Sequence, residues 1–164
     1  MSSSTTIQPA QKHNVGMGQI AIEEAPALLG SVLGSCVGLA LYHPRWKIAA
    51  FAHIVLPAAS GRAANPGKFA DTALPHMLDE LSRKGVPRNG LIAKIAGGAC
   101  MFGNASGPLQ IGDNNVDAVQ AILAMESIRI VGKDVGGQAG RRVTLDCSTG
   151  ELQVEIAGKT KIIL

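Results

Sequence analysis

The chain has 164 residues, 46% hydrophobic and 16% charged, which is enough for a sizeable core but too few for two ordinary domains. Its 15 basic and 12 acidic residues give a formal charge of +3 without a basic run, and aromatic residues are scarce, so a nucleic-acid role is not indicated. No apolar stretch approaches the roughly 20 residues that span a bilayer, and the first residues lack the features of a signal peptide. We therefore expect a cytoplasmic protein without direct membrane insertion.

The N-terminal stretch predicts the domain boundary, and the cysteine spacing predicts the state of the thiols. Residues 1–14 are polar and lack periodicity, so we expect a disordered tail there, followed by one domain over residues 15–164. The three cysteines, Cys36, Cys100 and Cys147, are widely separated and have no Cys-x-x-Cys spacing. Neither a disulfide framework nor a zinc site is therefore indicated, and we expect reduced thiols and no metal.

A β-hairpin is predicted over residues 36–56. Its two strands, residues 36–42 and 47–56, are rich in small, β-branched and apolar side chains, and a four-residue turn with a proline joins them at residues 43–46. Because polar residues alternate on neither face, we expect both faces of these strands to be covered.

The register of this hairpin brings a thiol and an imidazole together. If Tyr42 pairs with Lys47 across the turn, Cys36 lies directly opposite His53, with Cβ atoms about 5 Å apart. A slip of one residue would put the two side chains on different faces. The Cys36 face then carries small residues that leave room for an incoming group, namely Gly38, Ala40 and Ala49. Apolar residues fill the other face, namely Val37, Leu39, Ile48, Ile54 and Leu56.

Two helices and five further strands are predicted beyond the hairpin. One helix runs from about Phe69 to Lys84, with Asp71 as its N-cap and Gly85 at its end, and a second covers about residues 115–125. Strands are predicted at residues 91–96, 128–134, 141–146, 151–156 and 160–164, the last of them in a terminal meander. Because strands outnumber helices, we expect an α+β sandwich of mostly antiparallel strands.

Cys36 is the candidate nucleophile. A free cysteine usually packs as a small buried hydrophobe, but the opposed His53 supplies the base that a thiol nucleophile needs. The glycine- and serine-rich approach at residues 30–35 can bend sharply and aim backbone N–H groups at a developing oxyanion. The N–H groups of Ser35 and Cys36 are the candidates for that role. The other cysteines have no predicted base, and His43 is predicted to lie at the surface in the turn.

Six short blocks stand out along the chain, and they are residues 33–37 (LGSCV), 52–57 (AHIVLP), 68–73 (KFADTA), 94–99 (KIAGGA), 111–116 (IGDNNV) and 134–137 (DVGG). Together they resemble the chemoreceptor glutamine deamidases, the CheD family of bacterial chemotaxis. The resemblance covers roughly residues 15–155. It implies a layered α/β/β sandwich with both main helices on one side.

The resemblance also implies an activity. Members of this family hydrolyse selected glutamine side chains on methyl-accepting chemotaxis receptors to glutamates, without a metal or organic cofactor, and in some bacteria they bind a CheC-type phosphatase. The family nucleophile and base correspond to Cys36 and His53. In the expected cycle, a thiolate–imidazolium pair lowers the thiol pKa, the thiolate attacks the carboxamide, and water hydrolyses the resulting thioester.

A third family residue is a threonine shortly before the cysteine. Here the matching hydroxyl is Ser31, five residues before Cys36. Serine supplies the same hydrogen bond with a less restricted rotamer, so Ser31 is the expected partner of His53.

Two other classes of function fit the same residues. A non-catalytic binding module would use the pocket to dock a receptor segment or to regulate a CheC-type phosphatase. A redox sensor would show reversible thiol oxidation without amide chemistry. Selective labelling of Cys36 over Cys100 and Cys147 by an electrophilic amide analogue distinguishes an activated thiol from a docking groove.

Overall fold

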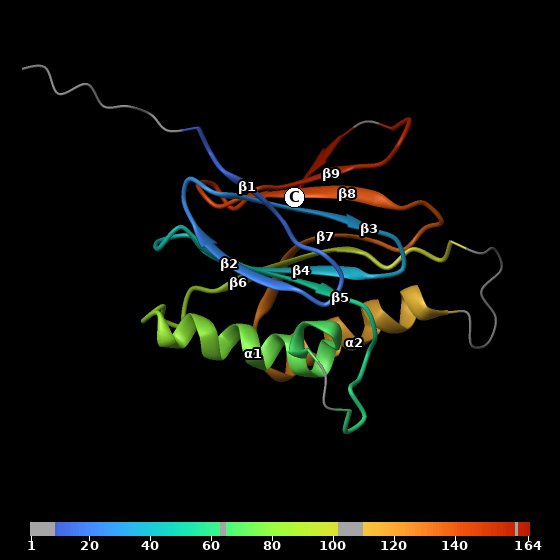
Figure 1. The fold of residues 1–164 in the computed structure, drawn as a ribbon, viewed down its shortest axis with the longest axis horizontal. Helices are drawn as coiled ribbons and strands as arrows, with labels where there is room; N and C mark the ends of the chain where they lie inside the picture. The colour runs from blue at the N-terminus through green and yellow to red at the C-terminus, as the bar shows by residue number, and fades with distance from the viewer. Residues whose placement is uncertain (1–8, 63–64, 102–109, 160) are drawn as a thin grey trace, which may run out of the picture.

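The computed structural model describes residues 9–62, 65–101, 110–159 and 161–164, which form two five-stranded sheets and two α-helices. The three layers are plain in Figure 1: one sheet lies outermost, the second lies in the middle, and both helices cover the far face of the middle sheet. The prediction of an α+β sandwich with two main helices on one side is confirmed.

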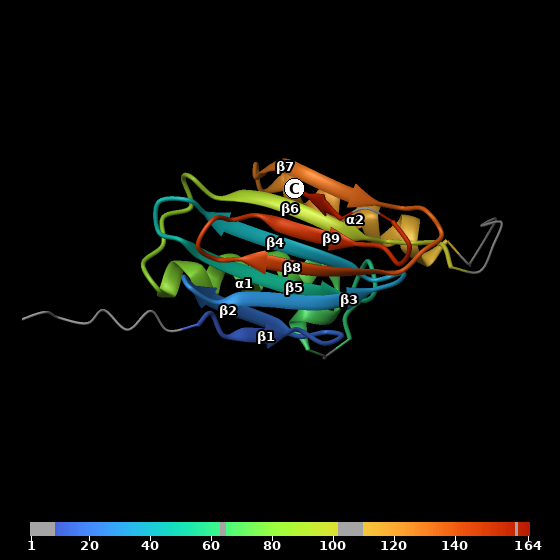
Figure 2. The same cartoon turned by 90° about the horizontal axis from the view of Figure 1, so that it is seen from above.

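The outer sheet consists, in spatial order, of β1 (Lys12–Asn14), β3 (Leu28–Leu33), β8 (Arg141–Asp146), β9 (Leu152–Glu155) and β10 (Ile162–Ile163). The middle sheet consists of β2 (Ile20–Glu24), β5 (Ile48–Ile54), β4 (Val37–His43), β6 (Ile92–Gly97) and β7 (Arg129–Val135). Only the β1–β3 and β6–β7 pairs of the described strands are parallel. Seen from above in Figure 2, β8 and β9 lie over β4 and β5. The predicted meander is confirmed by the antiparallel series β8, β9 and β10.

Strand β1 lies inside the stretch for which disorder was predicted. Lys12–Asn14 pairs in parallel with the start of β3, and the N–H of Val15 donates to Gly30 O at 2.7 Å. The prediction of disorder is therefore wrong for residues 12–14, while residues 1–8 lie outside the described residues. Backbone pairing to a neighbouring strand stabilises this short polar segment, and side-chain patterns carry no signal for it.

The first helix, α1 (Ala70–Arg83), agrees with its prediction within one residue at each end. Gly85 follows it with a φ of 80°, a conformation that favours glycine after a helix. The predicted N-cap is wrong: extended Phe69 occupies that position, and Asp71 instead accepts a hydrogen bond from the N–H of Ala59 at 3.0 Å. A single 3-10 turn, Pro66–Lys68, leads into the helix.

The second helix, α2 (Ile111–Met125), begins one turn earlier than predicted. Its first turn contains Gly112, where a Cβ would stand 2.6 Å from the carbonyl oxygen of Gly98. The helix therefore starts in close contact with the end of β6, which a search for an apolar stripe does not detect. Neither described helix is long and apolar enough to cross a membrane.

Apolar side chains form a core on each side of the middle sheet. Every residue of β4 and β5 is buried, as predicted for strands covered on both faces. Val37, Leu39, Ile48 and Ile54 belong to the cluster that packs against the helices. Cys36, Ala40, Ala49 and Phe51 belong to the cluster between the two sheets. The predicted division of this hairpin into two faces is confirmed for these residues apart from Phe51, which carried no prediction. The prediction that small residues on the Cys36 face leave room for an incoming group is wrong at Gly38, because the side chains of Phe51 and Leu33 fill the space above it.

The predicted register of the hairpin is wrong by one residue on each strand. The closing pair is His43 with Ile48, so the turn consists of Pro44–Lys47, and His53 stands opposite Gly38 instead of Cys36. The N–H of Lys47 closes the turn by donating to His43 O at 2.8 Å. The backbone of Lys47 has a φ of 48°. Because the two displacements add to an even number of positions, Cys36 and His53 keep the same side of the sheet as diagonal neighbours.

Candidate functional site

His53 lies where three chain segments meet. Its side chain comes from β5, and the residue is only 4% exposed. Its Nδ1 atom lies 2.8 Å from Ser31 Oγ of β3 and 3.2 Å from the carbonyl oxygen of Val15, just after β1. The hydroxyl of Ser31 also donates to that same carbonyl at 2.7 Å. The predicted contact between Ser31 and His53 is therefore present in the structure.

These three contacts determine which ring nitrogen carries the proton. The carbonyl of Val15 can only accept, and the single hydroxyl proton of Ser31 is directed to it. The oxygen of Ser31 then accepts from Nδ1, and all three contacts are satisfied only when Nδ1 is protonated. In neutral His53, this assignment leaves Nε2 with a free lone pair, as a base requires.

Cys36 occupies the residue before β4 and is 8% exposed. The segment around it is held by its carbonyl groups. Gly34 O accepts from the N–H of Ala99 at 2.9 Å, and Cys36 O accepts from the N–H of Gly98 at 2.8 Å. Between them, Ser35 O accepts from Asn115 Nδ2 at 3.0 Å. Three consecutive carbonyl groups are thus fixed by residues of the β6–α2 connection and of α2.

The N–H groups of this segment differ from its carbonyl groups. Within the described part of the chain, the N–H groups of Ser35 and Cys36 donate to no acceptor. Free backbone donors beside a nucleophile are the groups that stabilise a tetrahedral oxyanion. The assignment of these two N–H groups to an oxyanion stays a prediction.

Burial governs the ionisation of both groups. It raises the pKa of the Cys36 thiol above its ordinary value. Burial also lowers the pKa of His53, and the hydrogen bond to Val15 opposes this only in part. Both groups are therefore neutral near pH 7. The expected lowering of the thiol pKa by a thiolate–imidazolium pair is not found in this resting state.

The remaining cysteines lie in different environments. Cys147 is completely buried, and burial raises its pKa to about 12, with the charges of Asp146 and Glu23 adding to the shift. Cys100 is partly exposed, and its N–H donates to Gly137 O at 2.9 Å. Among the described residues, none of the three thiols is hydrogen-bonded to a histidine, and no group of three or more His, Cys, Asp or Glu side chains could hold a metal ion.

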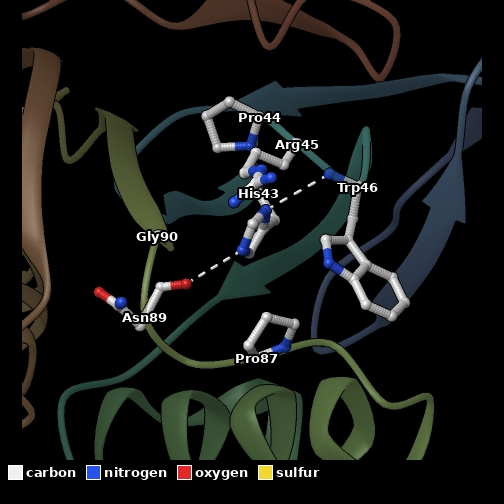
Figure 3. A pocket seen from close by; sticks show the side chains of 7 residues that line it. All are labelled: His43, Pro44, Arg45, Trp46, Pro87, Asn89 and Gly90. Carbon is white, nitrogen blue, oxygen red and sulfur yellow. Dashed lines mark hydrogen bonds between the residues drawn. The ribbon is translucent and has the colours of Figure 1, made fainter.

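A surface pocket lies at the opposite end of the β4–β5 hairpin (Figure 3). It is lined by the turn and by the segment before β6, namely His43, Pro44, Arg45, Trp46, Pro87, Asn89 and Gly90. The surface position predicted for His43 is wrong, because this residue is 2% exposed. Its Nε2 lies 3.0 Å from Asn89 O, and its Nδ1 accepts from the N–H of Trp46 at 3.4 Å. With both nitrogens engaged by the backbone, His43 holds the turn in place.

Two participants in the site carry no assignment from the sequence. The carbonyl of Val15 contributes a backbone atom, which no residue pattern reveals. Asn115 has a detectable signal: it stands one turn before Val119 on the buried face of a helix, where an amide is unexpected, and its own exposure is 0%. A polar residue in an apolar stripe indicates a specific hydrogen-bonding role.

Comparison with known proteins gives one consistent family. The family model described as "CheD chemotactic sensory transduction" matches residues 55–156. A probable chemoreceptor glutamine deamidase CheD of Symbiobacterium thermophilum is 45% identical, with 88% of this chain and 92% of the relative covered. A relative with the same name, probable chemoreceptor glutamine deamidase CheD, from Methanococcus maripaludis is 38% identical, with 91% of this chain and 97% of the relative covered. The chemoreceptor glutamine deamidase CheD of Thermotoga maritima is 38% identical, with 90% and 93% covered.

Proposed function

This chain belongs to the CheD family, and from that premise we propose that it hydrolyses glutamine side chains on methyl-accepting chemotaxis receptors to glutamates. The relatives named as chemoreceptor glutamine deamidases match about nine-tenths of the chain, which includes the hairpin with Cys36 and His53. The reaction releases ammonia and needs only a nucleophile, a base, oxyanion donors and water.

One observation carries the assignment of roles. The contacts of His53 with Ser31 and Val15 fix the ring and place the proton on Nδ1, so Nε2 is the basic atom. His53 and Cys36 are diagonal neighbours on one face of the hairpin, and the side chains of Phe51 and Leu33 pack over Gly38, which stands opposite the histidine. We assign Cys36 as nucleophile, His53 as general base and Ser31 as the group that orients the base.

The proposed cycle starts from the neutral pair. His53 Nε2 takes the thiol proton as Cys36 Sγ attacks the carboxamide carbon, and the N–H groups of Ser35 and Cys36 stabilise the oxyanion. The carbon–nitrogen bond then breaks, and imidazolium donates its proton to the departing nitrogen, which leaves as ammonia. Water, deprotonated by His53, attacks the thioester, and the thiolate leaves and recovers its proton. The products are glutamate and the free enzyme.

Transferring the proton during attack fits the burial of the two groups. A separated thiolate–imidazolium pair is disfavoured where the thiol pKa is raised and the imidazole pKa is lowered. A bound carboxamide gives the developing negative charge a new location, on an oxygen that faces backbone donors. The substrate therefore participates in activating the nucleophile.

The same burial favours one alternative. A thiol that is 8% exposed and neutral suits a module that docks a receptor segment, or binds a CheC-type phosphatase, without turnover. The two functions differ in what Cys36 does to a bound amide.

The test uses the full chain and purified receptor cytoplasmic domains. Deamidation adds about one dalton for each glutamine converted, which intact-mass analysis detects, and a glutamine-derived chloromethyl ketone should alkylate Cys36 before Cys100 or Cys147. No mass change on any receptor domain, together with unselective alkylation, would support the docking function instead. Adding a CheC-type phosphatase to the same assay tests the proposed partner through the change in rate.

A further inference from the structure

Asn115 is a buried amide on a helix face that otherwise packs into the core. Its exposure is 0%, and Val116 and Val119 beside it belong to the cluster between the helices and the middle sheet. A polar amide in such a place is unfavourable unless hydrogen bonds compensate its loss of water. The bonds of this side chain therefore explain its position.

The amide nitrogen donates to the two chain segments that flank the site strands. Asn115 Nδ2 donates to Ser35 O at 3.0 Å and to Val55 O at 2.9 Å. Ser35 directly precedes Cys36, and Val55 follows His53 by two residues. One amide group thus connects the segment that carries the candidate nucleophile to the segment that carries the candidate base.

The orientation of this amide is determined by its partners. Both neighbours of Nδ2 are carbonyl oxygens, so the reverse orientation would place Oδ1 against two acceptors. In the observed orientation, Oδ1 is buried and has no hydrogen-bond partner among the described residues. This orientation leaves Oδ1 without a hydrogen bond, but it lets Nδ2 donate to both carbonyl oxygens.

The close approach of α2 to the end of β6 fixes the position of Asn115. A Cβ on Gly112 would stand 2.6 Å from Gly98 O, so the helix can approach the β6 end this closely only with glycine there. A Cβ on Gly98 would in turn meet the side chain of Val116. Gly98 also donates to Cys36 O, so the helix and the nucleophile segment contact the same residue.

From these contacts we infer that Asn115 is a positioning residue, which sets the placement of Cys36 relative to His53 through the carbonyls of Ser35 and Val55. Among the described residues, the hydrogen bonds of its side chain go to these two backbone carbonyls and to neither of the two side chains. Losing its two donors would release the segment before Cys36 from the strand of His53, and displacements of about 1 Å at a reacting atom cost about 100-fold in rate. The catalytic part of this inference rests on the proposed function.

The test compares Asn115→Ala with Val119→Ala. Val119 lies one turn further along the same helix and is equally buried. Its side chain has no hydrogen-bond donor, so it cannot bind the carbonyls of Ser35 and Val55. Both variants should lower the thermal midpoint. At a temperature where both are fully folded, Asn115→Ala should lower kcat for receptor deamidation at least about tenfold with KM nearly unchanged. Val119→Ala should keep kcat within about twofold.

A second readout does not depend on receptor turnover. The rate constant for alkylation of Cys36 by iodoacetamide, followed against pH, reports the environment of the thiol directly. Asn115→Ala should change this profile, and Val119→Ala should reproduce the parent profile. If both variants match the parent in this profile, the inference is overturned even where no receptor substrate is known. If the profile changes while the parent protein deamidates nothing, the positioning role stands and the proposed function fails.

A third variant covers failure to fold. If Asn115→Ala is not recovered folded, Asn115→Thr, with a side chain of similar volume, replaces it with the same expected results. An Asn115→Thr protein with the parent kcat and the parent alkylation profile would overturn the inference.

Discussion

Ser31 Oγ lies 2.8 Å from His53 Nδ1, and this contact crosses from the outer sheet to the middle sheet. The orientation of the histidine therefore depends on how the two sheets pack against each other. Val15 extends the network to the segment after β1, so three chain segments meet at one imidazole.

Removing the hydroxyl of Ser31 should reduce activity without preventing substrate binding. In Ser31→Ala, Nδ1 keeps only the longer contact with Val15 O, and the ring loses part of its orientation. We expect kcat to fall about 10- to 100-fold with KM little changed. Ser31→Thr retains the hydroxyl with a more restricted rotamer and should keep the parent kcat. Steady-state kinetics by mass spectrometry checks both, and an unchanged kcat in Ser31→Ala would remove Ser31 from the site.

The pH profile of kcat/KM should show a broad plateau. Activity requires neutral His53, whose pKa burial lowers, so the acidic limb should lie below the ordinary histidine value of about 6.5. Proton transfer from the thiol requires protonated Cys36, whose pKa burial raises, so the alkaline limb should lie above about 8.5. An acidic limb centred above about 6.5 would contradict the lowered pKa of His53, and an alkaline limb set by a raised His53 pKa would instead indicate a preformed thiolate–imidazolium pair.

The cysteines should differ in their response to iodoacetamide. Cys147 is fully buried with a pKa of about 12, so it should stay unmodified in the folded protein and react once the chain is unfolded in urea. Cys36 should react in the folded state, faster as the pH rises. Peptide mapping after timed quenching gives both rates, and modification of Cys147 at the rate of Cys36 in the folded protein would contradict the buried environment described here.

The sequence predicts the layered fold and the shared face of Cys36 and His53 better than it predicts the details. The hairpin strands and both helices follow from apolar periodicity, which is a property of local sequence. The sequence does not reveal the position of the hairpin turn, because a lysine, Lys47, adopts the left-handed conformation that glycine or asparagine usually marks. The neutral state of the thiol was missed because burial depends on the packing of both sheets, which a single hairpin cannot reveal.

Gly38, opposite His53, is the position in the hairpin where added volume should be least tolerated. A Cβ there would stand 2.6 Å from Phe51 Cζ and 3.0 Å from Leu33 Cδ1, all within the packed layer between the sheets. Gly38→Ala should lower the free energy of unfolding by about 1–3 kcal/mol. Gly16→Ala, where the nearest atom is a flexible Gln19 Oε1 at 3.4 Å, is the matched control and should change it by less than about 0.5 kcal/mol. Urea titration measures both values, and equal stability of the two variants would contradict the packing.

The central claim, that Cys36 is the nucleophile of a glutamine deamidase, has one direct measurement. Cys36→Ala removes the sulfur and little volume, so it should fold normally, and its incubation with a receptor cytoplasmic domain should leave the intact mass unchanged. The parent protein and Cys100→Ala should each add about one dalton for every glutamine converted. Conversion by Cys36→Ala at the parent rate would contradict the account.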